Sequence, residues 1–132
     1  MGYNTDGLTF NTLRRGGLAR LPEFKNNKGE TAHSKADGSD WSLNDWAVAV
    51  TGELGEACNV LKKVRRGDLT LDEARPLLTQ EFADVVIYMD LLASQAGIAL
   101  GQAVMDTFNN KSIKVGSRVR LAADDWHYAE EK

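Results

Sequence analysis

The sequence predicts an all-α fold, an antiparallel helical bundle, and three observations lead to this fold class. Apolar residues recur at alternating steps of four and three from residue 43 to 64 and from 78 to 96, which is the spacing of one helix face. Each of these segments follows or contains a helix-capping sequence, Ser42-Leu43-Asn44-Asp45 or Thr70-Leu71-Asp72-Glu73. No segment has a credible strand pattern. We therefore expect residues 1–132 to form a single helical domain, small enough that oligomerisation would complete its core.

The first predicted helix covers Leu8 to Leu21, where apolar residues recur although Gly16 and Gly17 weaken the pattern. Residues 22–40 are polar and have no period, so we expect a long loop there. A loop of that length is uncommon in a compact domain unless it serves a function.

The second predicted helix begins after Ser42 and ends at Gly67, a residue suited to a helix C-terminal cap. The third is expected to begin near Pro76, because proline is best tolerated in a first turn, and to end at Gly97. A fourth helix covers roughly residues 100–111, and residues 116–132 form a tail with no assigned element.

Composition excludes several classes of protein. The net charge of −3 provides no basic footprint for nucleic acid, and no apolar run approaches the roughly 20 residues of a membrane span. The single cysteine, Cys58, excludes an internal disulfide and fits a reducing compartment. The first residues lack a signal-peptide pattern, so we expect a cytoplasmic protein.

Two acidic pairs indicate a function. Glu53 and Glu56 lie on the second predicted helix, and Glu81 and Asp84 on the third. The i, i+3 spacing places both carboxylates of a pair on one helix face, one residue before the apolar positions and so beside the core. Such a group of carboxylates repels itself unless a cation lies between them, and Mg²⁺ or Mn²⁺ prefers oxygen ligands. Alternatively, the acids are ordinary surface charges, but that does not explain their equal phase.

The acidic pattern resembles that of the MazG-like all-α nucleoside triphosphate pyrophosphohydrolases, which have Glu-x-x-Glu on one helix and Glu-x-x-Asp on the next. Residues 52–67, 81–89 and 108–121 carry the resemblance, which covers roughly residues 40 to 121. It implies a Mg²⁺- or Mn²⁺-dependent enzyme, with two or more ions per site, that converts a (d)NTP to the monophosphate and pyrophosphate. It also implies a homodimer or homotetramer, and these metal ligands: Glu53, Glu56, Glu81 and Asp84. Glu53 or Glu56 would orient the attacking water.

The chain is also similar to short phage-type members of this family. The MazZ-like group among them acts on dGTP and GTP. That similarity implies a purine-selective enzyme, located in the host cytoplasm if a phage encodes it.

Basic and aromatic residues are candidates for binding the substrate. The helix face that carries each acidic pair is called the acidic stripe. Lys63 lies on it two turns after Glu56 and is the first candidate for a phosphate contact. The other phosphate candidates are Lys62, Arg66, Lys111, Lys114 and Arg118. Each could instead be a surface charge or complement a helix dipole. The candidates for base or sugar contacts are Trp41, Trp46, Asn59 and Asn109, although each tryptophan could equally be a core anchor.

A second hypothesis is a helical oligomer without catalytic activity, which uses its apolar faces for assembly or partner binding. Such a protein has no need for acidic pairs in equal phase on two helices, so the acidic stripe favours the enzyme.

Overall fold

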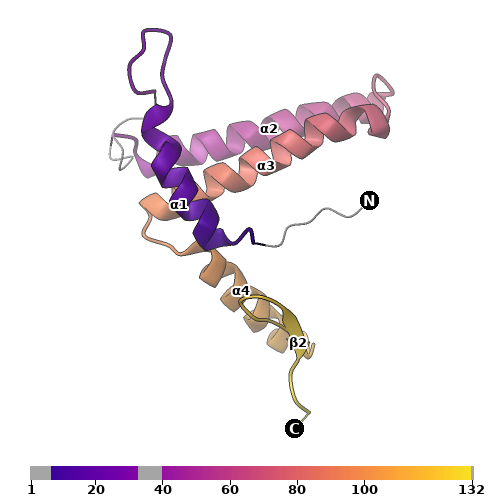
Figure 1. Cartoon of the computed structure of the whole chain (residues 1–132). Helices are drawn as coiled ribbons and strands as arrows, with labels where there is room; N and C mark the ends of the chain where they lie inside the picture. Colours follow the sequence, from indigo (N-terminus) through magenta and orange to yellow (C-terminus); the bar gives the residue numbers. More distant parts are fainter. Residues whose placement is uncertain (1–6, 33–39, 132) are drawn as a thin grey trace. The chain divides into compact units, whose positions relative to one another are not determined.

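A computed structural model describes residues 7–32 and 40–131 of the chain, and the described residues are mostly helical (Figure 1). The helices are α1 (Phe10–Arg20), α2 (Leu43–Arg66), α3 (Leu71–Gln95) and α4 (Leu100–Lys114), with a 3-10 turn, η1 (Leu21–Glu23). The strands are β1 (Val119–Leu121) and β2 (Trp126–Tyr128). These elements form two compact units, one ending at Gly97 and one beginning at Ile98. The all-α fold class is confirmed, whereas the single domain stays a prediction.

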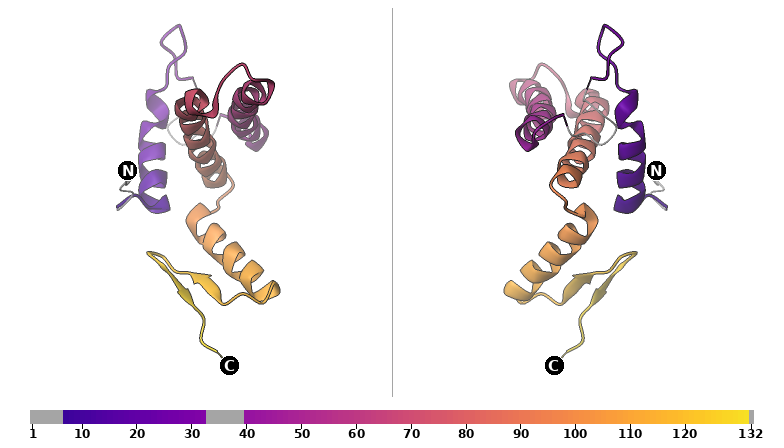
Figure 2. Two further views of the ribbon diagram at one scale, coloured as in Figure 1. Left: turned by 90° about the vertical axis from the view of Figure 1, so that its right-hand side faces the viewer. Right: turned by 90° about the vertical axis from the view of Figure 1, so that its left-hand side faces the viewer.

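Helices α2 and α3 form a helical hairpin, and α3 lies between α1 and α2 (Figure 2). The predicted ends of α2 are confirmed. Ser42 and Asp45 form a reciprocal capping box at its start, and Gly67, with a φ of 84°, ends it in the left-handed conformation. The short connection from Gly67 to Thr70 makes α2 and α3 neighbours.

The prediction that the third helix begins near Pro76 is wrong. Helix α3 begins at Leu71, where the Thr70 hydroxyl accepts a hydrogen bond from the Glu73 amide at 3.1 Å. The Glu73 carboxylate accepts one from the Thr70 amide, also at 3.1 Å. Pro76 therefore lies in the second turn, where it cannot donate to the carbonyl of Asp72. The capping box secures the first turn and so allows the helix to begin before the proline.

The core of the first unit consists of two clusters of buried side chains. Leu21, Trp46 and Leu91 form one cluster, which joins the end of α1 to α2 and α3. Ala57, Ala74 and Leu78 form the other, near the connection between α2 and α3. The small alanine side chains allow the two helices to approach closely there.

The packed faces of α2 and α3 coincide with the predicted apolar faces only in part: Val50, Ala57 and Leu78 are buried as predicted. On α2 the buried residues are Trp46, Val50 and Ala57, a spacing that includes Glu53 on the same stripe. By contrast, several predicted core residues are 38–50% exposed: Leu54, Leu61, Phe82 and Met89. The acidic residues therefore lie within the contact between α2 and α3, and a row of apolar side chains faces outward.

The second unit contains an antiparallel strand pair, which contradicts the prediction that the chain has no strands. Val119 pairs with Tyr128 and Leu121 with Trp126. Strands of three residues are too short to show a period of two, so the sequence pattern could not reveal them. Helix α4 continues to Lys114, three residues beyond its predicted end.

Among the described residues, no single helix is long and apolar enough to cross a membrane. The bent pair of α3 and α4 passes the test by length and composition together, which is weak evidence because core helices of soluble proteins also pass it.

Candidate metal centre

Three of the four predicted metal ligands come together between α2 and α3. One carboxylate oxygen from each of Glu53, Glu81 and Asp84 lies within 4.8 Å of the other two. Glu53 comes from α2, and the other two come from α3, one helical turn apart. All three side chains are half-buried, because they belong to the faces on which the two helices pack.

The carboxylates perturb one another. The pKa of Glu81 is raised to about 7, first by desolvation and then by the side chains of Glu56 and Glu53. The pKa of Glu53 is also raised, mainly by desolvation. The contact with Glu81 opposes this rise, and the charges of Glu56 and Asp84 add to it. Glu56, although exposed, therefore belongs to the same electrostatic cluster as the other three acids.

The cluster fits a hard divalent cation. The Oε2 atom of Glu81 is buried and has no hydrogen-bond partner among the described residues. In the metal-free protein a proton on Glu81 reduces the repulsion, but once Glu81 ionises, its neighbours Glu53 and Glu56 cannot donate to it, because ionised carboxylates only accept hydrogen bonds. A cation would satisfy this oxygen and relieve the repulsion, and an all-oxygen set of ligands suits Mg²⁺ or Mn²⁺.

A cavity of about 290 Å³ lies beside the acids. Glu53 and Asp84 line it from α2 and α3, and Arg20 lines it from the end of α1. The remaining lining residues are mainly apolar or aromatic: Gly17, Leu21, Phe24, Ile87, Tyr88 and Leu91. This volume is close to the lower limit of small-molecule pockets, roughly 300–1,000 Å³. The cavity can therefore admit part of a ligand that also reaches the acidic cluster.

Tyr88 and Arg20 share the electrostatic field of this cavity. Desolvation raises the pKa of Tyr88, the charges of Glu53 and Asp84 raise it further, and the positive charge of Arg20 opposes them. The guanidinium carbon Cζ of Arg20 lies 5.3 Å from the ring centroid of Phe24, within reach of a cation–π interaction. The cavity thus has an acidic side and a basic side.

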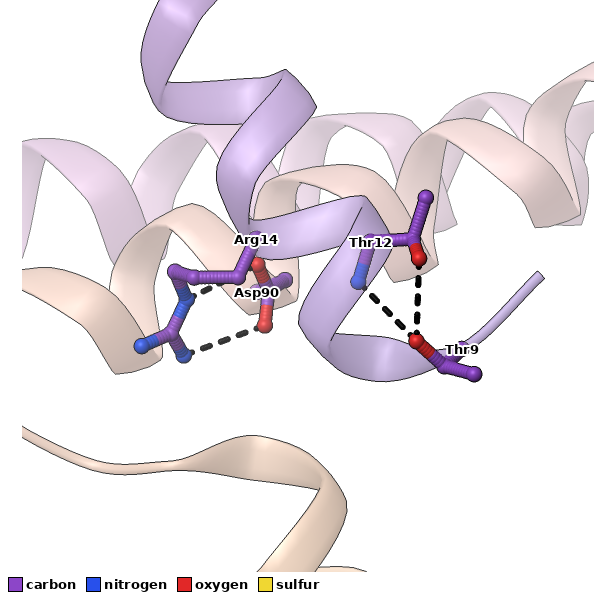
Figure 3. Close-up of polar contacts among 4 residues, drawn as sticks. All are labelled: Thr9, Thr12, Arg14 and Asp90. Carbon is purple, nitrogen blue, oxygen red and sulfur yellow. Dashed lines mark hydrogen bonds and ion pairs between the residues drawn. The ribbon is translucent and has the colours of Figure 1, made fainter. Parts of the chain in front are cut away.

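An ion pair fixes the wall of the cavity that α1 provides (Figure 3). Asp90 on α3 is buried and accepts two hydrogen bonds from Arg14 on α1, from Nε at 3.0 Å and from Nη2 at 3.1 Å. Thr9 caps α1 by accepting a hydrogen bond from the Thr12 amide at 3.0 Å (Figure 3). A bidentate pair of this kind fixes both the position and the rotation of a helix.

The predicted phosphate contacts do not line this cavity. Lys62 and Lys63 are exposed on α2, and exposed Arg66 forms an ion pair with Asp68 at 2.8 Å. The other three belong to the second unit: Lys111, Lys114 and Arg118. Within that unit, Arg118 forms an ion pair with Glu131 at 3.1 Å.

The four predicted base or sugar contacts do not line this cavity either. Trp46 is fully buried, with its ring centroid 4.7 Å from that of Trp41, so it occupies the position of a core anchor. Trp41 is half-buried and Asn59 is exposed. The side-chain amide of Asn109 makes two hydrogen bonds to the backbone of Leu121. Its Nδ2 donates to the Leu121 carbonyl at 3.0 Å, and its Oδ1 accepts from the Leu121 amide at 2.7 Å. Asn109 therefore joins α4 to β1.

Sequence reasoning missed Arg20, Phe24 and Tyr88 as residues of the site. Tyr88 lies on the acidic stripe one turn after Asp84, and that position could have identified it as a residue of the site. No comparable signal identified the other two, because they depend on how α1 packs against α3.

No protein-family model, curated protein or solved structure matches the chain. The chemistry of the site therefore carries the argument for a metal centre.

Proposed function

We propose that the protein is a divalent-metal-dependent pyrophosphohydrolase that converts a (d)NTP to the (d)NMP and pyrophosphate. The observation that carries this proposal is the convergence of Glu53, Glu81 and Asp84, of which Glu81 has a buried carboxylate oxygen that lacks a hydrogen-bond partner among the described residues. The resemblance of the acidic pairs to those of MazG-like enzymes supplies the reaction class. The preference for purines, (d)GTP in particular, rests on that resemblance alone.

Each acidic residue has a role in this proposal. Glu53, Glu81 and Asp84 would hold Mg²⁺ or Mn²⁺, which neutralises phosphate charge and lowers the pKa of a bound water. Glu56 is exposed at the edge of the cluster, one turn after Glu53, and would accept the proton of the attacking water. The half-buried setting strengthens the electrostatic interactions on which such a reaction depends.

Self-association is part of the proposal. The outward-facing row on α2 and α3 contains Leu54, Leu61, Phe82 and Met89, which are 38–50% exposed. A second copy of the chain would bury such a row, as expected for a homodimer or homotetramer. In such an assembly Lys63, Lys111, Lys114 or Arg118 could bind phosphates from a neighbouring subunit.

The test is to incubate the protein with each (d)NTP and Mg²⁺ or Mn²⁺ and to identify the products. We expect a monophosphate and pyrophosphate in equal amounts. No monophosphate from any nucleotide would refute the proposal, and orthophosphate without pyrophosphate would show cleavage at another bond.

Matched variants connect the activity to the cluster. Glu53→Gln and Asp84→Asn are expected to abolish turnover while the far-ultraviolet circular dichroism remains helical, because each removes one anionic ligand. Asp72→Asn is the control, since this carboxylate lies on the same helix as Asp84 with its side chain 88% exposed. Normal activity in Glu53→Gln or Asp84→Asn would remove that residue from the metal centre.

The outward-facing apolar row also favours the second hypothesis, a helical oligomer without catalytic activity. The same product assay separates the two, because an assembly module releases no monophosphate.

A further inference from the structure

Arg20 occupies the side of the cavity that the acidic residues do not. It is the last residue of α1, whereas Glu53 and Asp84 line the cavity from α2 and α3. The guanidinium lies near the ring of Phe24, which lines the same cavity, so a second side chain limits where it can move.

Arg20 does not neutralise the acids that share the cavity with it. Among the described residues, no ion pair within 4.0 Å joins Arg20 to any carboxylate. Arg20, Glu53 and Asp84 line one cavity of about 290 Å³ without forming an ion pair. The cavity therefore separates a positive charge from two negative charges. A ligand that is cationic at one end and anionic at the other is complementary to that arrangement, and a metal-bound phosphate chain has this property.

An interaction with the helix dipole explains only part of the placement of Arg20. A basic residue in the last turn of a helix complements the helix dipole, and Arg20 does so for α1. Arg20 is exposed, as that interaction requires, but the helix dipole does not require this residue to line a cavity that Glu53 and Asp84 also line.

The packing of α1 holds Arg20 in place. The ion pair between Arg14 and buried Asp90 fixes α1 against α3, and Leu21, the residue after Arg20, is buried against Trp46 and Leu91. The backbone of Arg20 is thereby anchored on both sides, so only its side chain has to become ordered when a ligand binds.

We propose that Arg20 binds the phosphate chain of the substrate, as a cation that acts beside the metal that the acidic cluster would hold. A guanidinium presents two parallel N–H donors, which match two oxygens of a phosphate group. The identity of the substrate rests on the proposed function, whereas the binding of a metal-bound phosphate chain at Arg20 can be tested separately.

The test compares Arg20→Ala, Arg20→Lys and the control Arg15→Ala, which changes an exposed arginine of α1 that does not line the cavity. Calorimetry measures the binding of inorganic triphosphate in the presence of Mg²⁺, and kinetics measures kcat and KM for the preferred (d)NTP. We expect Arg20→Ala to weaken triphosphate binding and lower kcat/KM by roughly 10- to 100-fold, the value of a lost charged hydrogen bond. Arg20→Lys should retain part of the binding, and Arg15→Ala should match the unmodified protein.

The outcomes separate the two proposals. If the protein hydrolyses nucleotides and Arg20→Ala binds triphosphate normally, the role of Arg20 is overturned and the proposed function stands. If turnover falls while triphosphate binding does not change, Arg20 contacts another part of the substrate, and the phosphate assignment is wrong. If no nucleotide is cleaved but Arg20→Ala weakens triphosphate binding, the proposed function is refuted and the phosphate site at Arg20 stands. If the unmodified protein neither cleaves nucleotides nor binds triphosphate, both proposals are overturned.

Thermal unfolding checks that the variants are folded. Should Arg20→Ala unfold early, Arg20→Gln preserves the size of the side chain without its charge, and the same criteria then apply to it.

Discussion

Removing the Asp90 carboxylate tests whether the ion pair between α1 and α3 holds the cavity together. The side chain of Asp90 is 3% exposed and that of Arg14 is 22% exposed, so Asp90→Ala leaves a largely buried guanidinium without its carboxylate. The loss of one partner of a buried ion pair costs about 3–5 kcal/mol. We expect a loss near the lower limit of that range, because the exposed part of Arg14 keeps some hydration.

The exposed ion pair of Asp72 and Arg75 on α3 provides a matched control. Its N–O distance is 2.6 Å, shorter than the 3.0 Å of the buried pair, yet its side chains are 88% and 61% exposed. Exposed pairs contribute at most about 1 kcal/mol, so Asp72→Ala should have a small effect although its contact is shorter. A double variant, Arg14→Met with Asp90→Leu, should recover most of the stability, because it removes both buried charges and fills their space.

The assay is urea unfolding followed by circular dichroism, with the free energy of unfolding extrapolated to water. The reasoning is refuted if Asp90→Ala costs no more than Asp72→Ala, or if the double variant is less stable than Asp90→Ala alone. In enzyme assays the Asp90→Ala protein should also show a raised KM, because Arg20 loses its support.

Two further predictions concern the acidic cluster and the outward-facing row. In the metal-free protein the pKa of Glu81 is about 7, above its ordinary value of 4.5, so the folded state keeps a proton that the unfolded chain loses. The free energy of unfolding should therefore fall as the pH rises from about 4.5 to about 7, and Glu81→Gln should reduce that slope; an unchanged slope in unfolding experiments across this range would contradict the assignment. Phe82→Asp should convert an oligomer to monomers in size-exclusion chromatography with light scattering, because it places a charge in the exposed apolar row; an oligomer of unchanged size would exclude that row as the interface.

Local signals in the sequence predicted most of the helices and the acidic cluster. The capping residues Ser42 and Thr70 and the glycines that follow the helices have local effects, and the predicted bounds of α2 match the observed ones for that reason. The acidic residues Glu53, Glu81 and Asp84 were identified from their phase alone, because residues in equal phase on two adjacent antiparallel helices face one common groove.

Tertiary packing decided what the sequence pattern left open. The apolar residues on α2 and α3 cover more than one face of each helix, so the pattern did not reveal which face meets the other helix and which faces outward. Trp46 could have been a base contact or a core anchor until the burial of its ring was known. The same is true of Arg20, whose place in the cavity depends on the distant contact between Arg14 and Asp90.

The most direct test of the central claim, that the acidic cluster is a metal centre, is a titration with Mn²⁺. Electron paramagnetic resonance detects the free ion, so the bound fraction can be measured without any substrate. We predict that the unmodified protein binds Mn²⁺ at neutral pH. The variant Glu81→Gln removes the carboxylate with the buried oxygen. It should bind Mn²⁺ at least about tenfold more weakly, as expected for the loss of one charged ligand. Equal binding by the two proteins, or no binding by the unmodified protein, would contradict the claim.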